Sequence, residues 1–212
     1  MQIPAPRLLI AGAFTDCASG ERIAVVDPST GESFAEIARG REEEIDRAVQ
    51  AARVALDGDW GQLSAVERGR RLLKLSRLVE ENADWLTWLE SRDVGKPKSQ
   101  ARADALALAR YCEFYGGAAD KVHGETIPYQ NGYTVLTWRE PHGVTGHIIP
   151  WNYPMQIFGR SVGAALAMGN ACVVKPGEDA SLTTLAVAEL AQRAGFPAGA
   201  LQVVTGYGEE AG

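Results

Sequence analysis

The sequence predicts an α/β fold in which a helical N-terminal layer packs on a doubly wound parallel sheet and a β-hairpin protrudes. Residues 42–119 carry apolar side chains at helical spacing. From residue 143 onward, three short apolar runs alternate with helical patterns, which is typical of parallel βαβ units. The intervening residues 126–142 show the alternation of a hairpin. The three runs, which we expect to be strands, are 144–149, 171–174 and 201–204.

The composition argues against several classes of function. With 46% hydrophobic residues among 212, the chain can bury a sizeable core. Its net charge of −6 argues against nucleic acid or an anionic membrane as a partner, because both bind basic surfaces. It shows no apolar stretch long enough to span a membrane, and residues 1–13 do not resemble a targeting signal. Scattered cysteines and histidines, three of each, predict a reducing, cytoplasmic setting and no metal site.

The N-terminal half begins with short strands over residues 8–37, joined by turns. Four helices follow. Three consecutive glutamates from Glu42 suit the positive N-terminus of the first helix. Ser64 and Glu67 have the spacing of a capping box at the start of the second. The expected helices cover residues 42–56, 64–81, 82–93 and 99–119, and Pro97 separates the last two.

Two features of this helical layer allow both a functional and a structural interpretation. A basic cluster on the second helix could bind nucleic acid, but interleaved glutamates and the acidic chain favour a solvated helix face. Trp85 and Trp88 could stack on a cofactor, but their helical spacing favours packing in the core or an interface. The basic cluster comprises Arg68, Arg70, Arg71, Lys74 and Arg77.

The loops after the first two expected parallel strands carry the strongest functional signals, because ligands bind such sheets beyond the carboxyl ends of the strands. In the first loop, Pro150 and Pro154 restrict the backbone on either side of Asn152. A rigidly held amide can donate a hydrogen bond to an oxygen that becomes negative during a reaction. The alternative is an asparagine that only satisfies backbone groups of the turn.

The second loop places an ammonium, Lys175, and a carboxylate, Glu178, on one tight turn. Such a pair can hold the two hydroxyls of a ribose, or it can be a simple surface ion pair. Gly206 and Gly208 follow the third strand, and their spacing alone is a weak signal, because glycine-rich turns after strands are common. Cys172 lies inside a strand and His147 inside another, so we interpret both as structural residues.

Five segments resemble, in order and spacing, the NAD(P)-dependent aldehyde dehydrogenase superfamily, and the resemblance covers essentially the whole chain. The segments are DVGKP, FYGGAADKVHGETIP, REPHGV, IIPWNYP and GNACVVKPGE. The resemblance implies a Rossmann-like fold that binds NAD and the oxidation of an aldehyde to a carboxylic acid. It implies that Asn152 is the side-chain half of an oxyanion hole and that Lys175 and Glu178 hold the adenosine ribose. A carboxylate would repel a 2′-phosphate, so NAD is favoured over NADP. The remaining implied cofactor contacts are Ile148, Ile149, Pro150, Trp151 and Gly206.

The resemblance also divides the chain into three parts. Residues 1–125 would pack on the cofactor domain, residues 143–212 would form the first half of the NAD-binding βαβαβ domain, and residues 126–142 would form the hairpin. In the hairpin, residues 133–140 would pair with residues 127–130 across the Asn131-Gly132 turn. In the family the corresponding strands pair between subunits, which implies a homo-oligomer. The alternative is a hairpin that folds onto its own domain.

The family's nucleophilic cysteine and general-base glutamate lie, by this resemblance, beyond the last residue of this sequence. Three hypotheses therefore stay open. The chain is the N-terminal part of an aldehyde dehydrogenase that acts with the remainder of the enzyme or with a companion chain. It is a non-catalytic nucleotide-binding or partner-binding module left by truncation. Or it is a structural fragment with an open sheet edge that favours association.

Overall fold

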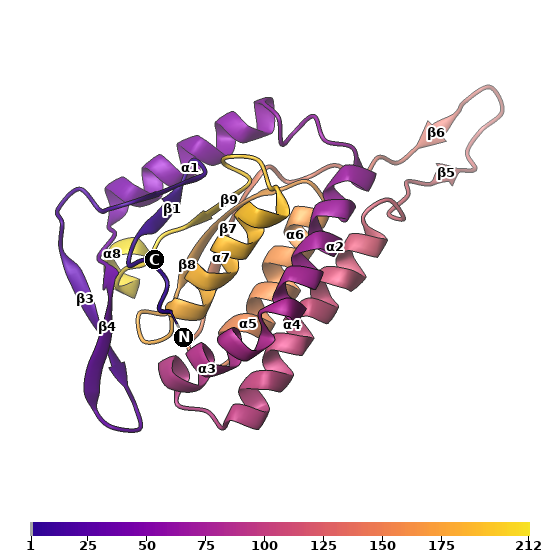
Figure 1. Cartoon of the computed structure of the whole chain (residues 1–212). Helices are drawn as coiled ribbons and strands as arrows, with labels where there is room; N and C mark the ends of the chain where they lie inside the picture. The colour runs from indigo at the N-terminus through magenta and orange to yellow at the C-terminus, as the bar shows by residue number, and fades with distance from the viewer. Residues whose placement is uncertain (1) are drawn as a thin grey trace.

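A five-stranded mixed sheet, in the order β2-β1-β9-β8-β7, forms the centre of the molecule (Figure 1). The computed structural model describes residues 2–212. Strands β7, β8 and β9 are parallel, as predicted, whereas β1 runs antiparallel to β9 and pairs with β2. The two edge strands are β2 and β7, and the parallel part of the sheet ends at β7, because β1 pairs along the outer side of β9. The strands are β1 (Leu8–Ile10), β2 (Ala13–Thr15), β7 (Val144–Ile149), β8 (Ala171–Pro176) and β9 (Leu201–Val203).

Helices cover both faces of this sheet. On one face α1 (Glu42–Asp57) contacts the three parallel strands. On the other face α7 (Leu182–Ala194) contacts β9 and β1. The crossover between β7 and β8 lies beside α7. It is one uninterrupted run of helix whose middle turn is π-helical. Its parts are α5 (Pro154–Phe158), η1 (Gly159–Gly163) and α6 (Ala164–Ala167).

A second helical layer lies outside α7 and the crossover helix, where α2 and α4 run side by side (Figure 1). The capping box at Ser64 is confirmed, since Ser64 Oγ accepts from the Glu67 backbone N–H and Glu67 Oε2 accepts from the Ser64 N–H at 2.9 Å. The layer consists of α2 (Ala65–Glu81), α3 (Ala83–Val94) and α4 (Lys98–Ala118), close to the predicted bounds.

The basic cluster of α2 is only partly a solvated face. Arg68 donates to the Ala167 carbonyl at 3.1 Å and Arg71 donates to the Gly195 carbonyl at 2.9 Å. Both carbonyls lie at helix C-termini, where unpaired acceptors and the helix dipole favour a cation. These two arginines therefore join the outer layer to the ends of α6 and α7, which sequence spacing alone could not predict. Trp85 and Trp88 pack against the core, as expected.

Two antiparallel ribbons extend from the body. Strands β3 (Arg22–Asp27) and β4 (Glu32–Ala38) form the first, and β5 (Thr126–Ile127) and β6 (Val135–Leu136) form the second. The second ribbon is much shorter than the predicted strands, because it projects into solvent without a sheet to extend its pairing (Figure 1). It leaves apolar side chains exposed, including Trp138 at 81%.

Asp93, at the end of α3, satisfies the N-terminus of α7 from a different element. Its Oδ2 accepts from the Leu182 backbone N–H at 2.9 Å, and only 2% of the residue is exposed. Burial raises the pKa of Asp93 to about 8. Its Oδ1 is buried without a hydrogen-bond partner among the described residues, as suits a protonated carboxyl.

A buried carboxyl of this kind makes the stability depend on pH. Between about pH 4 and pH 8 the folded state keeps a proton that the unfolded state has released, so stability falls as pH rises through this window. We expect Asp93→Asn to reduce this loss by up to about 1.4 kcal/mol per pH unit, because an amide does not titrate. Urea unfolding at several pH values measures the slope. Asp84→Asn, on the exposed side of the same helix, should leave it unchanged, and equal slopes for all three proteins would refute the assignment.

Gly206, which follows β9, lies against the backbone between β4 and α1. A methyl group there would overlap with the carbonyl oxygen of Gly40, and the Gly40 N–H in turn donates to the Thr205 carbonyl at 2.8 Å. A methyl group at Gly208, by contrast, would meet open space. Gly206 therefore has a packing role that does not depend on any ligand.

Gly206→Ala should lower the free energy of unfolding by about 1–3 kcal/mol, because an added methyl group must displace backbone. Gly208→Ala is the matched control and should change it by less than about 0.5 kcal/mol. Denaturant titration without nucleotide measures both. Equal stability of the two variants would show that the loop moves freely away from Gly40.

Candidate functional site

The parallel register brings the predicted loops to one end of the sheet. Ile149 lies opposite Pro176, and the Gly177 N–H donates to the Ile149 carbonyl at 2.7 Å. On the other side of β8, the Val204 N–H donates to the Val174 carbonyl at 2.9 Å. The loops that begin at residues 150, 177 and 205 therefore leave the sheet side by side. Ligands bind to α/β sheets at this end, beyond the carboxyl ends of the parallel strands.

Asn152 lies in the first of these loops, on an exposed turn that is held by hydrogen bonds to residues between α3 and α4 and on α4 itself. Its carbonyl accepts from Lys96 Nζ at 3.0 Å. The next residue, Tyr153, accepts at its hydroxyl from Gln100 Nε2 at 2.8 Å, and its carbonyl accepts from the Ile157 N–H as α5 begins. The side chain of Asn152 thus stands on a fixed backbone and faces solvent, where its amide can donate to a bound molecule.

Lys175 and Glu178 form a pair that is more buried than a surface salt bridge. Lys175 Nζ donates to Glu178 Oε2 at 2.7 Å, with the lysine side chain 6% exposed and the glutamate 33%. The hydrogen bond from Lys175 is the main cause that holds the pKa of Glu178 below its usual value. Glu178 is therefore ionised at neutral pH, and a carboxylate at this position is an acceptor for hydroxyl groups.

The other predicted contacts differ in their accessibility. Ile148 is 70% exposed and Trp151 is 61% exposed, and Pro150 is exposed between them. Ile149 is buried in the core, so it can meet a ligand only through its backbone. Gly206 is buried against Gly40, as described above.

Sequence reasoning missed the charged groups beneath Asn152. Lys96 Nζ donates to Glu90 Oε1 at 2.9 Å and to Asp104 Oδ2 at 2.6 Å, and all three residues are buried. Burial raises the pKa of Glu90 to about 7. The available signal was their position, since Glu90 and Asp104 fall on the inward faces of α3 and α4, where apolar residues are expected.

The remaining chemical groups are structural. Burial raises the pKa of Cys172 to about 12, which supports its interpretation as a strand residue without nucleophilic character. His147 lies within hydrogen-bond distance of Ser161 Oγ, at 2.6 Å, and Thr145 Oγ1, at 2.9 Å, and burial lowers its pKa. Within residues 2–212, no three His, Cys, Asp or Glu side chains are placed to hold a metal ion. Across the same residues, the helices are too short or too polar to cross a membrane.

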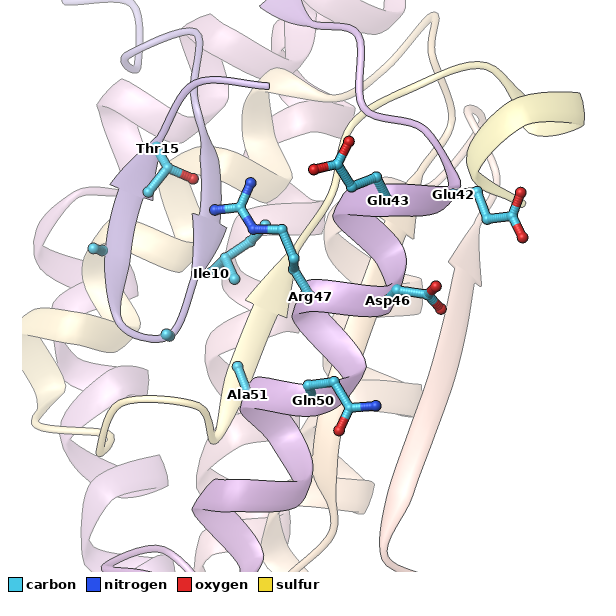
Figure 2. A pocket seen from close by; sticks show the side chains of 10 residues that line it. Ile10, Thr15, Glu42, Glu43, Asp46, Arg47, Gln50 and Ala51 are labelled. Carbon is cyan, nitrogen blue, oxygen red and sulfur yellow. The ribbon is translucent and has the colours of Figure 1, made fainter. Parts of the chain in front are cut away.

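Two cavities help to locate the site. One of about 340 Å³ is lined by Trp151, Glu178 and Asp93, so it opens at the predicted loops. A larger one of about 800 Å³ lies between β2 and α1 (Figure 2). Its walls are the β1–β2 hairpin and a helix face that carries Glu43, Asp46 and other polar groups. None of the predicted site residues lines this larger cavity, so we assign the site to the loops.

Comparison with known proteins connects this geometry to a family. Residues 14–212 match the model of the aldehyde dehydrogenase family. The chain is 46% identical to aldehyde dehydrogenase family 2 member B4, mitochondrial, from Arabidopsis thaliana. The alignment covers all of this chain and 40% of that protein. It is 47% identical to hydroxyisobutyraldehyde dehydrogenase from Mycolicibacterium austroafricanum, over 98% of this chain and 41% of that protein.

Solved structures of aldehyde dehydrogenases share the fold of this chain. A putative aldehyde dehydrogenase from Burkholderia cenocepacia superposes with a TM-score of 0.96 at 68% identity, over 97% of this chain and 43% of that one. The NAD⁺ complex of an aldehyde dehydrogenase from Bacillus cereus superposes with a TM-score of 0.95 at 38% identity, over 100% of this chain and 43% of that one. The chain thus spans about two fifths of the length of these relatives. Given the family match along almost its whole length, the chain belongs to the aldehyde dehydrogenase family.

Proposed function

We propose that this chain is the N-terminal part of an aldehyde dehydrogenase that oxidises an aldehyde to a carboxylic acid with NAD. The observation that supports the proposal is that the loops after β7 and β8 leave the same end of the sheet, the first carrying an anchored, exposed Asn152 and the second the Lys175–Glu178 pair. The NAD⁺ complex of the similar aldehyde dehydrogenase from Bacillus cereus supports the choice of cofactor.

In this proposal Asn152 stabilises charge during the chemical step. A thiolate attacks the aldehyde carbonyl, and the oxygen becomes an alkoxide that the Asn152 amide stabilises by donating a hydrogen bond. Bound NAD would supply the hydride acceptor that converts the adduct to a thioester, which water would then hydrolyse. In this proposal the remainder of the enzyme supplies the thiolate and the general base. All three cysteines of this chain, Cys17, Cys112 and Cys172, are buried, and burial raises the pKa of the last two to about 12.

The nucleotide is held by the second loop. The carboxylate of Glu178 accepts from the hydroxyls of the adenosine ribose and repels a 2′-phosphate, which selects NAD over NADP. The exposed faces of Ile148, Pro150 and Trp151 give the cofactor an apolar surface at the end of β7. Gly206, whose packing against Gly40 fixes the loop after β9, would lie close to the adenine, as the resemblance implies.

The β5–β6 ribbon is the proposed oligomerisation element. It carries exposed aromatic and aliphatic side chains. The ribbon precedes the start of β7, whereas Asn152 follows the end of that strand, so pairing with another subunit through the ribbon would leave the site open. The cytoplasmic setting stays a prediction, since relatives of this chain include proteins named as mitochondrial.

Asn152→Ala should lower kcat by about a hundredfold to a thousandfold in the complete enzyme, because one donor to the developing alkoxide is lost. The KM for NAD should change little. Steady-state kinetics of the chain joined to its catalytic portion measure both values. Gln62→Ala, in the exposed turn before α2, is the control and should leave kcat unchanged. A normal kcat for Asn152→Ala would contradict the proposal.

Glu178→Gln should raise the dissociation constant for NAD by about tenfold, because a neutral amide accepts hydrogen bonds more weakly than a carboxylate. It should also reduce the ratio between the dissociation constants for NADP and NAD, because the amide no longer repels a 2′-phosphate. Calorimetric titration of this chain with each nucleotide measures the dissociation constants. Asp59→Asn, an exposed carboxylate in the loop after α1 that does not line the cavity beside Glu178, should leave both constants unchanged. If the wild-type chain binds NAD but shows no catalysis even with the remainder of the enzyme, the non-catalytic module is the better description.

A further inference from the structure

The buried Lys96 connects three elements at a point directly below the Asn152 loop. It follows α3 and precedes α4, and its ammonium lies within hydrogen-bond distance of Glu90 Oε1 (2.9 Å), Asp104 Oδ2 (2.6 Å) and the carbonyl oxygen of Asn152 (3.0 Å). An ammonium has three donors, so these three acceptors engage it completely. One of them is the backbone of the residue that we assign to the oxyanion hole.

Further contacts join the same charged cluster to the residues after Asn152. Lys96 Nζ lies 4.4 Å from the centre of the Tyr153 ring, over its face. Gln156 Nε2 donates to Asp104 Oδ1 at 2.6 Å. The two carboxylates are therefore held on helices α3 and α4. Lys96, between these helices, joins both of them to the Asn152 carbonyl, and Gln156 joins Asp104 to the first turn of α5.

The loop needs an external anchor of this kind. The prolines at 150 and 154 fix their own φ angles and restrict the residues that precede them, but leave the peptide unit after Asn152 free to rotate. A hydrogen bond to the Asn152 carbonyl fixes the orientation of that peptide unit. Because the carbonyl carbon is bonded to the Cα of Asn152, holding the carbonyl group also limits the displacement of that Cα and of the side chain that it carries.

We propose that Lys96 is a positioning residue, through which the buried Glu90–Lys96–Asp104 cluster holds the Asn152 backbone and aims its amide at the reacting oxygen. This inference rests on the proposed function of Asn152. Lys96 itself touches neither substrate nor cofactor. Its two carboxylate partners keep the ammonium in one place, since a buried cation without them would be strongly destabilised.

A double-mutant cycle in the complete enzyme tests the inference. Lys96→Met should lower kcat by about tenfold or more, because small displacements of a catalytic group are costly, and should change the KM for NAD by less than about threefold. In an Asn152→Ala background the same substitution should lower kcat by less than about twofold, because the group that it positions is already absent. An equal loss of kcat in both backgrounds would show a purely structural role and overturn the inference.

Two further variants complete the test. Lys98→Met removes an exposed lysine two residues away and should leave kcat unchanged. If Lys96→Met does not fold, the triple variant Glu90→Gln, Lys96→Met, Asp104→Asn removes the buried charges together and should retain the fold with the same coupling to Asn152. A folded triple variant with normal kcat would refute positioning by Lys96. If Asn152→Ala alone leaves kcat unchanged, the proposed function fails first, and the two failures are thereby distinguished.

Discussion

The parallel pairing of β7 with β8 is the constraint on which the site depends. It places Ile148 opposite Lys175 and Ile149 opposite Pro176, so the two chains leave the sheet at the same level. A shift of one residue would move Lys175 to the opposite face of the sheet, because side chains alternate along a strand. The relation between the asparagine loop and the ion pair of the second loop is therefore set by hydrogen bonds between main chains, which do not depend on the side chains that carry the chemistry.

Around the sheet, the molecule buries ionisable groups at positions where apolar side chains would be easier to accommodate. Asp93 at the start of α7, Glu90 within α3 and Asp104 within α4 are each almost completely inaccessible to solvent. Replacement of such groups by well-packed hydrophobic residues is often neutral or stabilising. Asp93 and Asp104 each connect a helix of the outer layer to the sheet domain, and Glu90 is joined to the Asn152 loop through Lys96. Their retention suits a role in geometry.

Local features of the fold could be predicted from the sequence, whereas features that depend on distant pairing could not. The Ser64–Glu67 capping box and the parallel strands follow from spacing within a few residues. The pairing of Leu9 with Val203 joins opposite ends of the chain, and nothing in either segment specifies it. Sequence motifs identify the candidate residues of the site, but they do not identify the buried residues that hold those candidates in place. Lys96 was visible only as one letter of a matching segment, and its three acceptors come from separate elements.

The contact between β1 and β9 also bears on how the chain is made. During synthesis the N-terminal hairpin leaves the ribosome long before its partner strand exists. At ordinary elongation rates the delay is roughly 10 to 40 s. Throughout that interval Leu8, Leu9 and Ile10, all buried in the finished molecule, lack the strand that covers them. The nascent chain therefore presents an unpaired, apolar strand edge of the kind that chaperones shield, and the sheet can close only when β9 has emerged.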